Sequence, residues 1–160
     1  LEALEADAKR LGIDIIHIKS IDMLKSSIKD FDFYFDRVLI DAPCTGLGVL
    51  QRNPDTKWKR SKKDIERLAA KQKKMINSAA NLVKPGGVLL YAVCSCEKEE
   101  NEDVIHAFLD KRTDFSIDKD FHSDKYSLFM THEGFLKTYP ESRNMDGFFA
   151  ARLVRKSKTN

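Results

Sequence analysis

Two short stretches carry all three cysteines of this sequence. The stretch "DAPCTGLG" places Asp41 and Cys44 directly after an apolar run at 38–40, and "LLYAVCSC" ends a second apolar run with Cys94 and Cys96. A buried cysteine is more often a small core residue than a nucleophile, and Cys96 fits that description. Cys44 and Cys94 differ because each follows a strand-like run, and two thiols beside an acid suit covalent chemistry. We therefore take Cys44 and Cys94 as candidate catalytic residues.

Methyl transfer to C5 of cytosine is a reaction that needs such a set. The C5 carbon is too electron-poor to accept a methyl group until a thiolate adds at C6 and makes the ring nucleophilic. The C5 proton is then lost and the thiolate leaves, a step that a second thiol can assist. An acid near N3 and the amino group of the base favours the addition. Because the base must leave its stack to be reached, a basic surface beside the pocket is expected to hold the backbone.

Helices and strands are predicted to alternate along the chain. Apolar residues at helical spacing predict helices at 1–11, 21–28, 61–82 and 97–111, with Ser61 and Asp64 as a capping box and "KPGG" as the end of the third. Short apolar or β-branched runs predict strands at 13–18, 37–40, 88–93, 115–117 and 148–154, and a long loop at 41–60. Several acids at the start of the last helix, Glu100 among them, suit the positive end of the helix dipole.

This alternation predicts a parallel α/β sheet that is covered on both faces. In such sheets, ligands bind at the carboxyl ends of the strands. Asp22 follows the run at 13–18, Asp41 follows the run at 37–40, and Cys94 follows the run at 88–93. We therefore expect these three side chains to lie in one crevice.

Positive charge is concentrated in one segment. Residues 51–74 carry ten basic and three acidic side chains, a net charge of +7, so the remainder is −4 in a chain of net charge +3. Such a field suits a polyanion such as nucleic acid, although a solvated helix face is the commoner meaning of a charge run. The position of the segment just after Cys44 favours a functional role. The basic residues are Arg52, Lys57, Lys59, Arg60, Lys62, Lys63, Arg67, Lys71, Lys73 and Lys74.

Bulk properties restrict the class of protein. The 160 residues, 42% hydrophobic and 33% charged, suit one globular domain or part of one, and no apolar run is long enough to span a membrane. Three cysteines do not make a disulfide framework, and no secretory signal opens the chain, so we expect a cytoplasmic protein. The cysteines and histidines form no tight ligand pair, which argues against structural zinc. The chain lacks an initiator Met, which suggests a fragment, a processed chain or a trimmed one.

Three motifs resemble one family of enzymes. The stretches "FDRVLIDAPCTGLGVLQRNPDTKW", "KPGGVLLYAVCSCEKEENEDVI" and "DGFFAARL" are similar to the catalytic domain of the Sun/Fmu family of 16S ribosomal RNA cytosine-5 methyltransferases, within the Nop2/Sun group. The resemblance covers residues 22–153 and is weakest at 113–134. It implies a Rossmann-like sheet, S-adenosylmethionine as cofactor and ribosomal RNA as partner.

The resemblance also implies roles for individual residues. Cys94 of "VCS" resembles the nucleophile that adds to C6, and Cys44 of "DAPC" resembles the thiol that helps to release the product. Asp41 is similar to an acid that lines the cofactor and base pocket, and Asp22 falls where the family has an acid on the adenosine part. Arg52 and Lys57 of "RNPDTKW" resemble residues of the RNA-facing loop, and Lys59 and Arg60, which follow in the basic segment, are taken as RNA-binding candidates with them.

The chain departs from the family near its start. The family sheet has strand order 3-2-1-4-5-7-6, and this sequence has neither the glycine-rich cofactor loop after strand 1 nor strand 2 with its ribose-binding acid. We therefore expect residues 1–160 to form one partial α/β methyltransferase domain that lacks the first two strands. Because the glycine-rich loop and the following helix normally hold the methionine end of the cofactor, the isolated chain is expected to bind S-adenosylmethionine weakly and to be inactive.

Other readings remain open at this point. The basic segment alone suits a non-catalytic RNA-binding module, and the thiols alone suit a redox or small-molecule Rossmann enzyme. DNA cytosine-5 methyltransferases also use a Pro-Cys thiol, which would make Cys44 the nucleophile, but "VCS" and "PDTKW" favour the RNA enzymes. Transfer RNA is an alternative substrate to ribosomal RNA.

Overall fold

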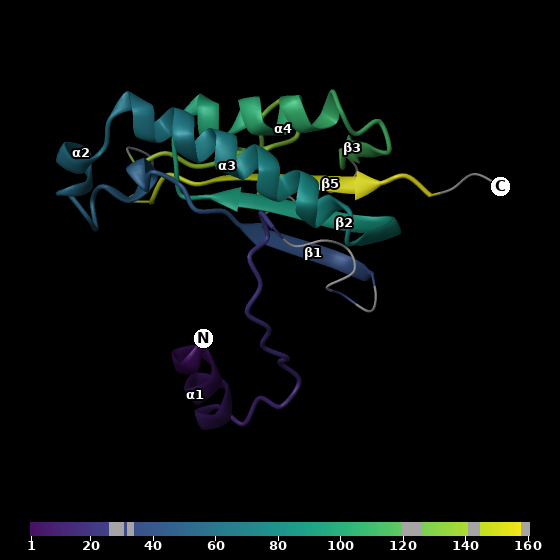
Figure 1. The fold of residues 1–160 in the computed structure, drawn as a ribbon. Coiled ribbons are helices and arrows are strands. Elements are labelled where there is room, and N and C mark those ends of the chain that lie inside the picture. Colours follow the sequence, from purple (N-terminus) through teal and green to yellow (C-terminus); the bar gives the residue numbers. More distant parts are fainter. Residues whose placement is uncertain (26–30, 32–33, 120–125, 141–144, 158–160) are drawn as a thin grey trace.

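A mixed β-sheet forms the centre of the computed structural model, which describes residues 1–25, 31, 34–119, 126–140 and 145–157 (Figure 1). Strands β1 (Phe35–Asp41) and β2 (Val83–Val93) pair in parallel, as the sequence predicts. Strand β5 (Phe149–Arg155) lies antiparallel between β2 and β3 (Phe115–Ile117), and β4 (Leu136–Lys137) adds to β5. The order β1-β2-β5-β3 is the 4-5-7-6 part of the expected family order.

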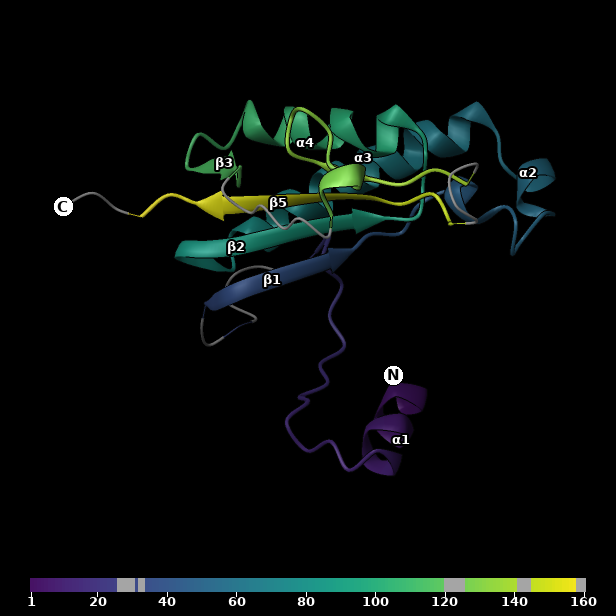
Figure 2. The same cartoon turned by 180° about the vertical axis from the view of Figure 1, so that it is seen from behind.

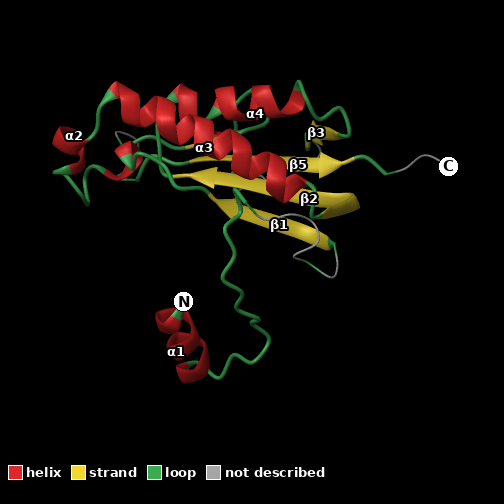
Figure 3. Cartoon of the chain, in the orientation of Figure 1, coloured by secondary structure: helices red, strands yellow, loops and turns green. Residues whose placement is uncertain are grey.

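Two helices cover one face of this sheet. Figures 1 and 3 show α3 (Lys62–Ala80) and α4 (Glu102–Leu109) side by side along it. The predicted capping box opens α3, since the Asp64 carboxylate accepts hydrogen bonds from the Ser61 amide and hydroxyl. Between the layers, side chains such as Leu89 and Phe149 are fully buried, each stabilising the fold by about 1.5–3 kcal/mol.

The opposite face of β1 is open, so the prediction that this strand is covered on both sides is wrong. Ile40 is buried against the helices, whereas Leu39 on the other face is 64% exposed. β1 is also an edge strand, because within the described residues it pairs with β2 alone. A groove of about 390 Å³ runs along this edge, lined by apolar side chains that include Met23, Val38 and Met75.

The N-terminal part lies away from the sheet. Helix α1 (Glu2–Arg10) is confirmed, and Figures 1 and 2 show it apart from the other elements, joined to them by an extended connection. The predicted strand at 13–18 is wrong, because these residues have no strand beside them within the described part and Ile15 is 83% exposed. Of the predicted helix at 21–28, residues 23–25 form a turn, and 26–28 lie outside the described residues.

Three further boundaries differ from the prediction. The helix expected at 97–111 is divided into η3 (Lys98–Glu100) and α4, because Asn101 has non-helical angles of φ −105° and ψ −105°. The loop expected at 41–60 contains two short helices, η2 (Leu47–Val49) and α2 (Thr56–Lys59). Helix α3 ends at Ala80, before "KPGG", which belongs to β2. A last short helix, η4 (Ser127–Phe129), precedes β4.

Candidate active site

The two candidate thiols meet where the parallel strands end. Cys44 follows β1 and Cys94 follows β2, and their Sγ atoms lie 3.0 Å apart. The loops run together because the sheet ladder continues past β1, where the Ala42 amide donates to the Ala92 carbonyl at 2.9 Å. Both side chains are half-buried. The structure therefore joins two residues that are fifty positions apart in the sequence.

The hydrogen bond between the thiols makes them unequal. Donation from the Cys44 thiol lowers the pKa of Cys94 from 9.0 to about 7, against the opposing effects of burial and of the Asp41 and Glu100 charges. The same bond raises the pKa of Cys44, and burial raises it further. Cys94 is therefore the thiol that loses its proton first, near neutral pH, while Cys44 keeps its proton. The partner thiol supplies the pKa shift that no lysine or histidine near Cys94 in the sequence offered.

Glu100 ties the two thiol loops together. Its side chain is fully buried. Its carboxylate accepts four hydrogen bonds: from the Thr45 backbone amide (3.0 Å), the Thr45 hydroxyl (2.5 Å), the Ser95 hydroxyl (2.6 Å) and the Gln72 side-chain amide (3.0 Å). Thr45 follows Cys44, and Ser95 follows Cys94. Glu100 lies just before α4, as its place in the sequence predicts, but its carboxylate is buried and turns inward towards these donors.

Further hydrogen bonds surround this carboxylate. The Tyr91 hydroxyl donates to the Glu100 carbonyl at 2.7 Å, and the Asn101 side chain donates to the Ser95 carbonyl at 3.1 Å. Gln72 also donates to the Pro43 carbonyl at 3.0 Å, so α3 holds the loop just before Cys44, while Glu100 holds it just after. The "EEN" motif was the only sequence signal for this network.

A close approach of two glycines fixes a third loop beside the thiols. The Gly48 amide donates to the Cys94 carbonyl at 3.1 Å, and the Gly147 amide donates to the Gly48 carbonyl at 2.7 Å. A Cβ atom added to Gly48 would lie 1.9 Å from the Gly147 carbonyl oxygen. The contact therefore needs glycine at position 48, and it joins the loops after β1 and β2 to the segment before β5.

The two candidate acids occupy different places. Asp41 ends β1, lines the groove at the strand edge, and lies near enough to Cys94 to oppose its ionisation. Asp22 lies in an exposed turn, where it accepts from the Leu24 amide at 3.0 Å and lies 3.9 Å from Lys25. Among the described residues, no recorded contact joins Asp22 to the thiols. Of the three side chains expected together, Asp41 and Cys94 therefore lie close to each other, while Asp22 lies next to Met23, which lines the groove.

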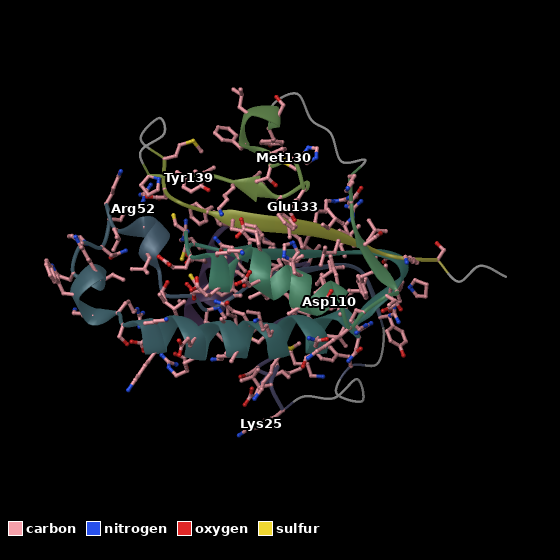
Figure 4. The ribbon with its side chains drawn as sticks, turned by 90° about the horizontal axis from the view of Figure 1, so that it is seen from above. Lys25, Arg52, Asp110, Met130, Glu133 and Tyr139 are labelled. Carbon is pink, nitrogen blue, oxygen red and sulfur yellow. The ribbon has the colours of Figure 1, made fainter. Side chains whose placement is uncertain are left out.

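The four candidate RNA-binding residues also divide into two kinds. Arg52 is 74% exposed but pairs with Asp146 at 2.5 Å, and the Arg60 guanidinium donates to the Thr45 carbonyl at 3.0 Å. Lys57 and Lys59 project from α2 and are exposed. Arg52 lies at the same end of the molecule as Tyr139 (Figure 4). The two arginines therefore stabilise the loop, while the two lysines stay open to a ligand.

The described ranges contain neither a cluster of metal-binding side chains nor a membrane-spanning helix. No group of three or more His, Cys, Asp or Glu side chains is arranged there to hold a metal ion. None of the helices there has the length and apolar composition that crossing a membrane requires.

Comparison with known proteins identifies the family. The model of the 16S rRNA methyltransferase RsmB/F family matches residues 1–154. The chain belongs to this family. It is 37% identical to the ribosomal RNA small subunit methyltransferase B of Shewanella oneidensis, over 97% of the chain and 37% of that protein. The corresponding protein of Cronobacter sakazakii is 35% identical, over 96% of the chain and 36% of that protein. The chain thus spans about a third of the length of these RsmB relatives.

Solved structures agree with this RsmB/F assignment. The crystal structure of NSun6 from Pyrococcus horikoshii with SFG matches 99% of the chain and 39% of its own length, with a TM-score of 0.79 and 31% identity. The crystal structure of PH0851 matches with a TM-score of 0.86 and 35% identity, over 95% of the chain and 34% of its own length. The fold is the Rossmann-like fold of S-adenosylmethionine-dependent methyltransferases, without some of its strands.

Proposed function

We propose that this RsmB/F chain carries the catalytic thiols of an enzyme that methylates C5 of a cytosine in RNA. The observation that supports this most directly is the 3.0 Å contact between Cys44 and Cys94 at the ends of two parallel strands. The contact leaves one sulfur ionised and the other protonated, which are the states that a nucleophile and a helper need.

Cys94 acts as the nucleophile in this proposal. Its thiolate forms a bond to C6 of the cytosine, and the electron pair of the C5–C6 double bond becomes available at C5. S-adenosylmethionine, when bound, would supply the methyl group to C5, and its methyl–sulfonium bond would break to leave S-adenosylhomocysteine. The proton on C5 then passes to a base, the C5–C6 double bond re-forms, and the C6–S bond breaks with its electron pair returning to sulfur. Each bond that forms at the addition step is matched by one that breaks at release.

Cys44 assists the release in this proposal. The Cys44 thiol donates to the Cys94 sulfur, and this hydrogen bond stabilises negative charge on that sulfur. The same stabilisation makes the Cys94 thiolate a better leaving group from C6. Asp41, at the end of β1, is proposed to face the N3 and amino edge of the base, where an acid favours the addition.

The groove beside β1 suits the adenosine end of the cofactor. Its lining is mainly apolar, with Met23 and Val38 as walls and the Asp41 carboxylate as a polar group at one end. Such a pattern is common in sites for small ligands, where a few polar groups fix the orientation. We propose Asp41, and Asp22 beside Met23, as cofactor-binding residues. The described residues offer no glycine-rich cradle for the methionine end.

Small-subunit ribosomal RNA is the proposed substrate. The relatives that match are named for ribosomal RNA of the small subunit. A cytosine that is reached by two half-buried thiols must be unstacked, and the exposed lysines of α2 lie in the loop that follows Cys44.

Trapping with 5-fluorocytosine RNA tests the proposed chemistry. Fluorine at C5 cannot leave as a proton does, so the adduct at C6 persists and can be mapped to a peptide. The assay uses a protein that carries this chain at the length of its relatives, with S-adenosylmethionine. We expect an adduct on the peptide that contains Cys94 and none in Cys94→Ala, with Cys96→Ala as the matched control. An adduct on Cys44, or unchanged methylation by Cys94→Ala, would overturn the assignment.

A further inference from the structure

Helix α2 holds an aromatic side chain that the proposed chemistry does not use. Trp58 is the only tryptophan of the chain and is 84% exposed. An indole ring normally buries most of its large apolar surface, and here it packs against no part of the core. The Lys57 ammonium group lies 5.5 Å from the centre of the ring. The tip of α2 therefore presents a flat apolar face with a cation beside it.

The loop around Trp58 is folded. The amides of Arg52 and Asn53 both donate to the Val49 carbonyl at 3.1 Å, and the Trp58 amide donates to the Asp55 carbonyl at 3.2 Å. These bonds fix the path of the chain from η2 into α2. The exposure of the ring thus belongs to a defined turn of the backbone.

The same loop is anchored beside the thiols. Arg60, two residues after Trp58, donates to the carbonyl of Thr45, the residue that follows Cys44. Two residues of extended chain span at most about 7 Å, so the backbone of Trp58 lies within that distance of the backbone of Arg60, whose side chain reaches on to Thr45. Trp58 therefore lies on the loop that Arg60 ties to the residue after Cys44.

Unpaired positive charge continues from Trp58 along α3. Among the described residues, the ion pair of Arg67 with Asp64 is the only one recorded for the basic side chains of 56–74. The remaining lysines of this segment are open to solvent or only partly covered, and cations so exposed suit contacts with phosphates. They are Lys57, Lys59, Lys62, Lys63, Lys71, Lys73 and Lys74.

We propose that Trp58 is a stacking platform for an unpaired base of the RNA strand that carries the target cytosine. Proteins that bind single-stranded nucleic acid combine a basic track with exposed aromatic rings, because every base offers a π-face and every nucleotide a phosphate. A duplex offers neither an unstacked base nor access to its face. The proposal rests on the proposed function in taking RNA as the substrate, and it adds a residue that selects single-stranded RNA.

The emission of Trp58 provides the test, because no other tryptophan contributes to it. The full 160-residue chain is titrated with a cytidine-rich single-stranded oligoribonucleotide, with a blunt RNA duplex of the same length, and with inorganic polyphosphate. We expect the single strand to quench the emission, and the duplex and polyphosphate to bind without comparable quenching. Unchanged emission at saturation with the single strand, or no binding of the single strand, would overturn the proposal.

Substitutions separate stacking from charge. Trp58→Ala is expected to weaken binding of the single strand about tenfold, Trp58→Phe to restore most of it, and neither to alter binding of polyphosphate. Tyr126→Ala removes an aromatic ring that is 46% exposed and lines a different cavity, and it is the matched control. Equal affinity of Trp58→Ala and the control for the single strand would refute stacking. Quenching without any methylation by the longer protein would refute the proposed function and leave the stacking platform standing.

Discussion

Replacing Glu100 by glutamine tests whether one buried carboxylate holds the thiol loops together. The change removes the charge and puts an amide group in place of one carboxylate oxygen, with almost no change in volume. Two donors, the Thr45 amide and Gln72, keep an oxygen acceptor. The hydroxyls of Thr45 and Ser95 lose theirs and must rotate to accept from the new amide. Ser95 already accepts from the Glu97 amide at 3.2 Å, so its hydroxyl has little freedom.

The cost follows from the kind of bond that is lost. A hydrogen bond to a charged group contributes about 1.5–3 kcal/mol and a neutral one about 0.5–1.5 kcal/mol, so four bonds that lose their charge cost about 4 kcal/mol in total. Partial recovery by rotation lowers the expected loss to about 2–4 kcal/mol. A domain of ordinary stability has about 5–15 kcal/mol in all, so Glu100→Gln is expected to remain folded but weakened.

Urea unfolding measures this loss, and alkylation of Cys94 by iodoacetamide reports the local effect. With a slope of about 1.5–2 kcal/mol/M, the midpoint should fall by about 1–2.7 M. Because Thr45 and Ser95 each follow a thiol, their loops should separate and the Cys44–Cys94 hydrogen bond should weaken. This bond has the largest effect on the Cys94 pKa, and the Glu100 charge, which raises that pKa, has the smallest, so the thiolate population of Cys94 at pH 7 should drop. Glu99→Gln, at the exposed neighbouring position, is the control and should change stability by less than about 0.5 kcal/mol. Equal midpoints for the two variants would show that Glu100 does not hold these loops.

Three further predictions concern the thiols, the glycine contact and the cofactor. The rate of alkylation of Cys94 should rise with pH around a midpoint near 7, where its thiol loses its proton. Cys44→Ala should move that midpoint up towards 9.0, whereas Cys44→Ser should keep it low. An unmoved midpoint in Cys44→Ala would mean that the Cys44 hydrogen bond does not lower the pKa of Cys94. Gly48→Ala should destabilise the fold by about 3 kcal/mol or more in urea unfolding, because its methyl group would overlap the Gly147 carbonyl; a loss below about 1 kcal/mol would mean that the two loops separate freely. Calorimetric titration of the 160-residue chain with S-adenosylmethionine should show a dissociation constant weaker than about 100 μM, because the groove is open and offers few polar groups, and micromolar binding would disprove this.

Local patterns predicted the elements that are stabilised by their own residues and their nearest neighbours. The spacing of Ser61 and Asp64 predicted the capping box correctly. The apolar runs before Asp41 and Cys94 predicted the parallel pair β1 and β2 correctly. The run at 13–18 has the same β-branched character, yet it forms no strand, because a strand also needs a partner for its backbone groups. The place of β5 between β2 and β3 agrees with the family order, but the expectation of a parallel sheet is wrong for β5, which is antiparallel to both neighbours, since no pattern in the strand itself specifies its direction.

The two thiols of the site could be predicted from the sequence, whereas the residues that hold their loops in place could not. Cys44 and Cys94 could be brought together by topology alone, since both follow parallel strands. Glu100 could not, because its donors come from residues 45, 72 and 95, and an acid next to other acids is typical of an exposed helix end. The pKa of Cys94 was hidden for the same reason, since its cause is a side chain fifty positions away.

The place of β5 in the sheet has a consequence for synthesis on the ribosome. β5 is the last strand along the chain but lies between β2 and β3, so β3 has no described neighbour in the sheet until β5 has emerged. Gly147, which holds Gly48 beside Cys94, lies just before β5. A nascent chain that already displays both cysteines therefore still lacks the last contact that fixes their loops. Translation that stops before residue 147 would release a polypeptide that has both thiols but lacks the Gly147–Gly48 contact that fixes their loops.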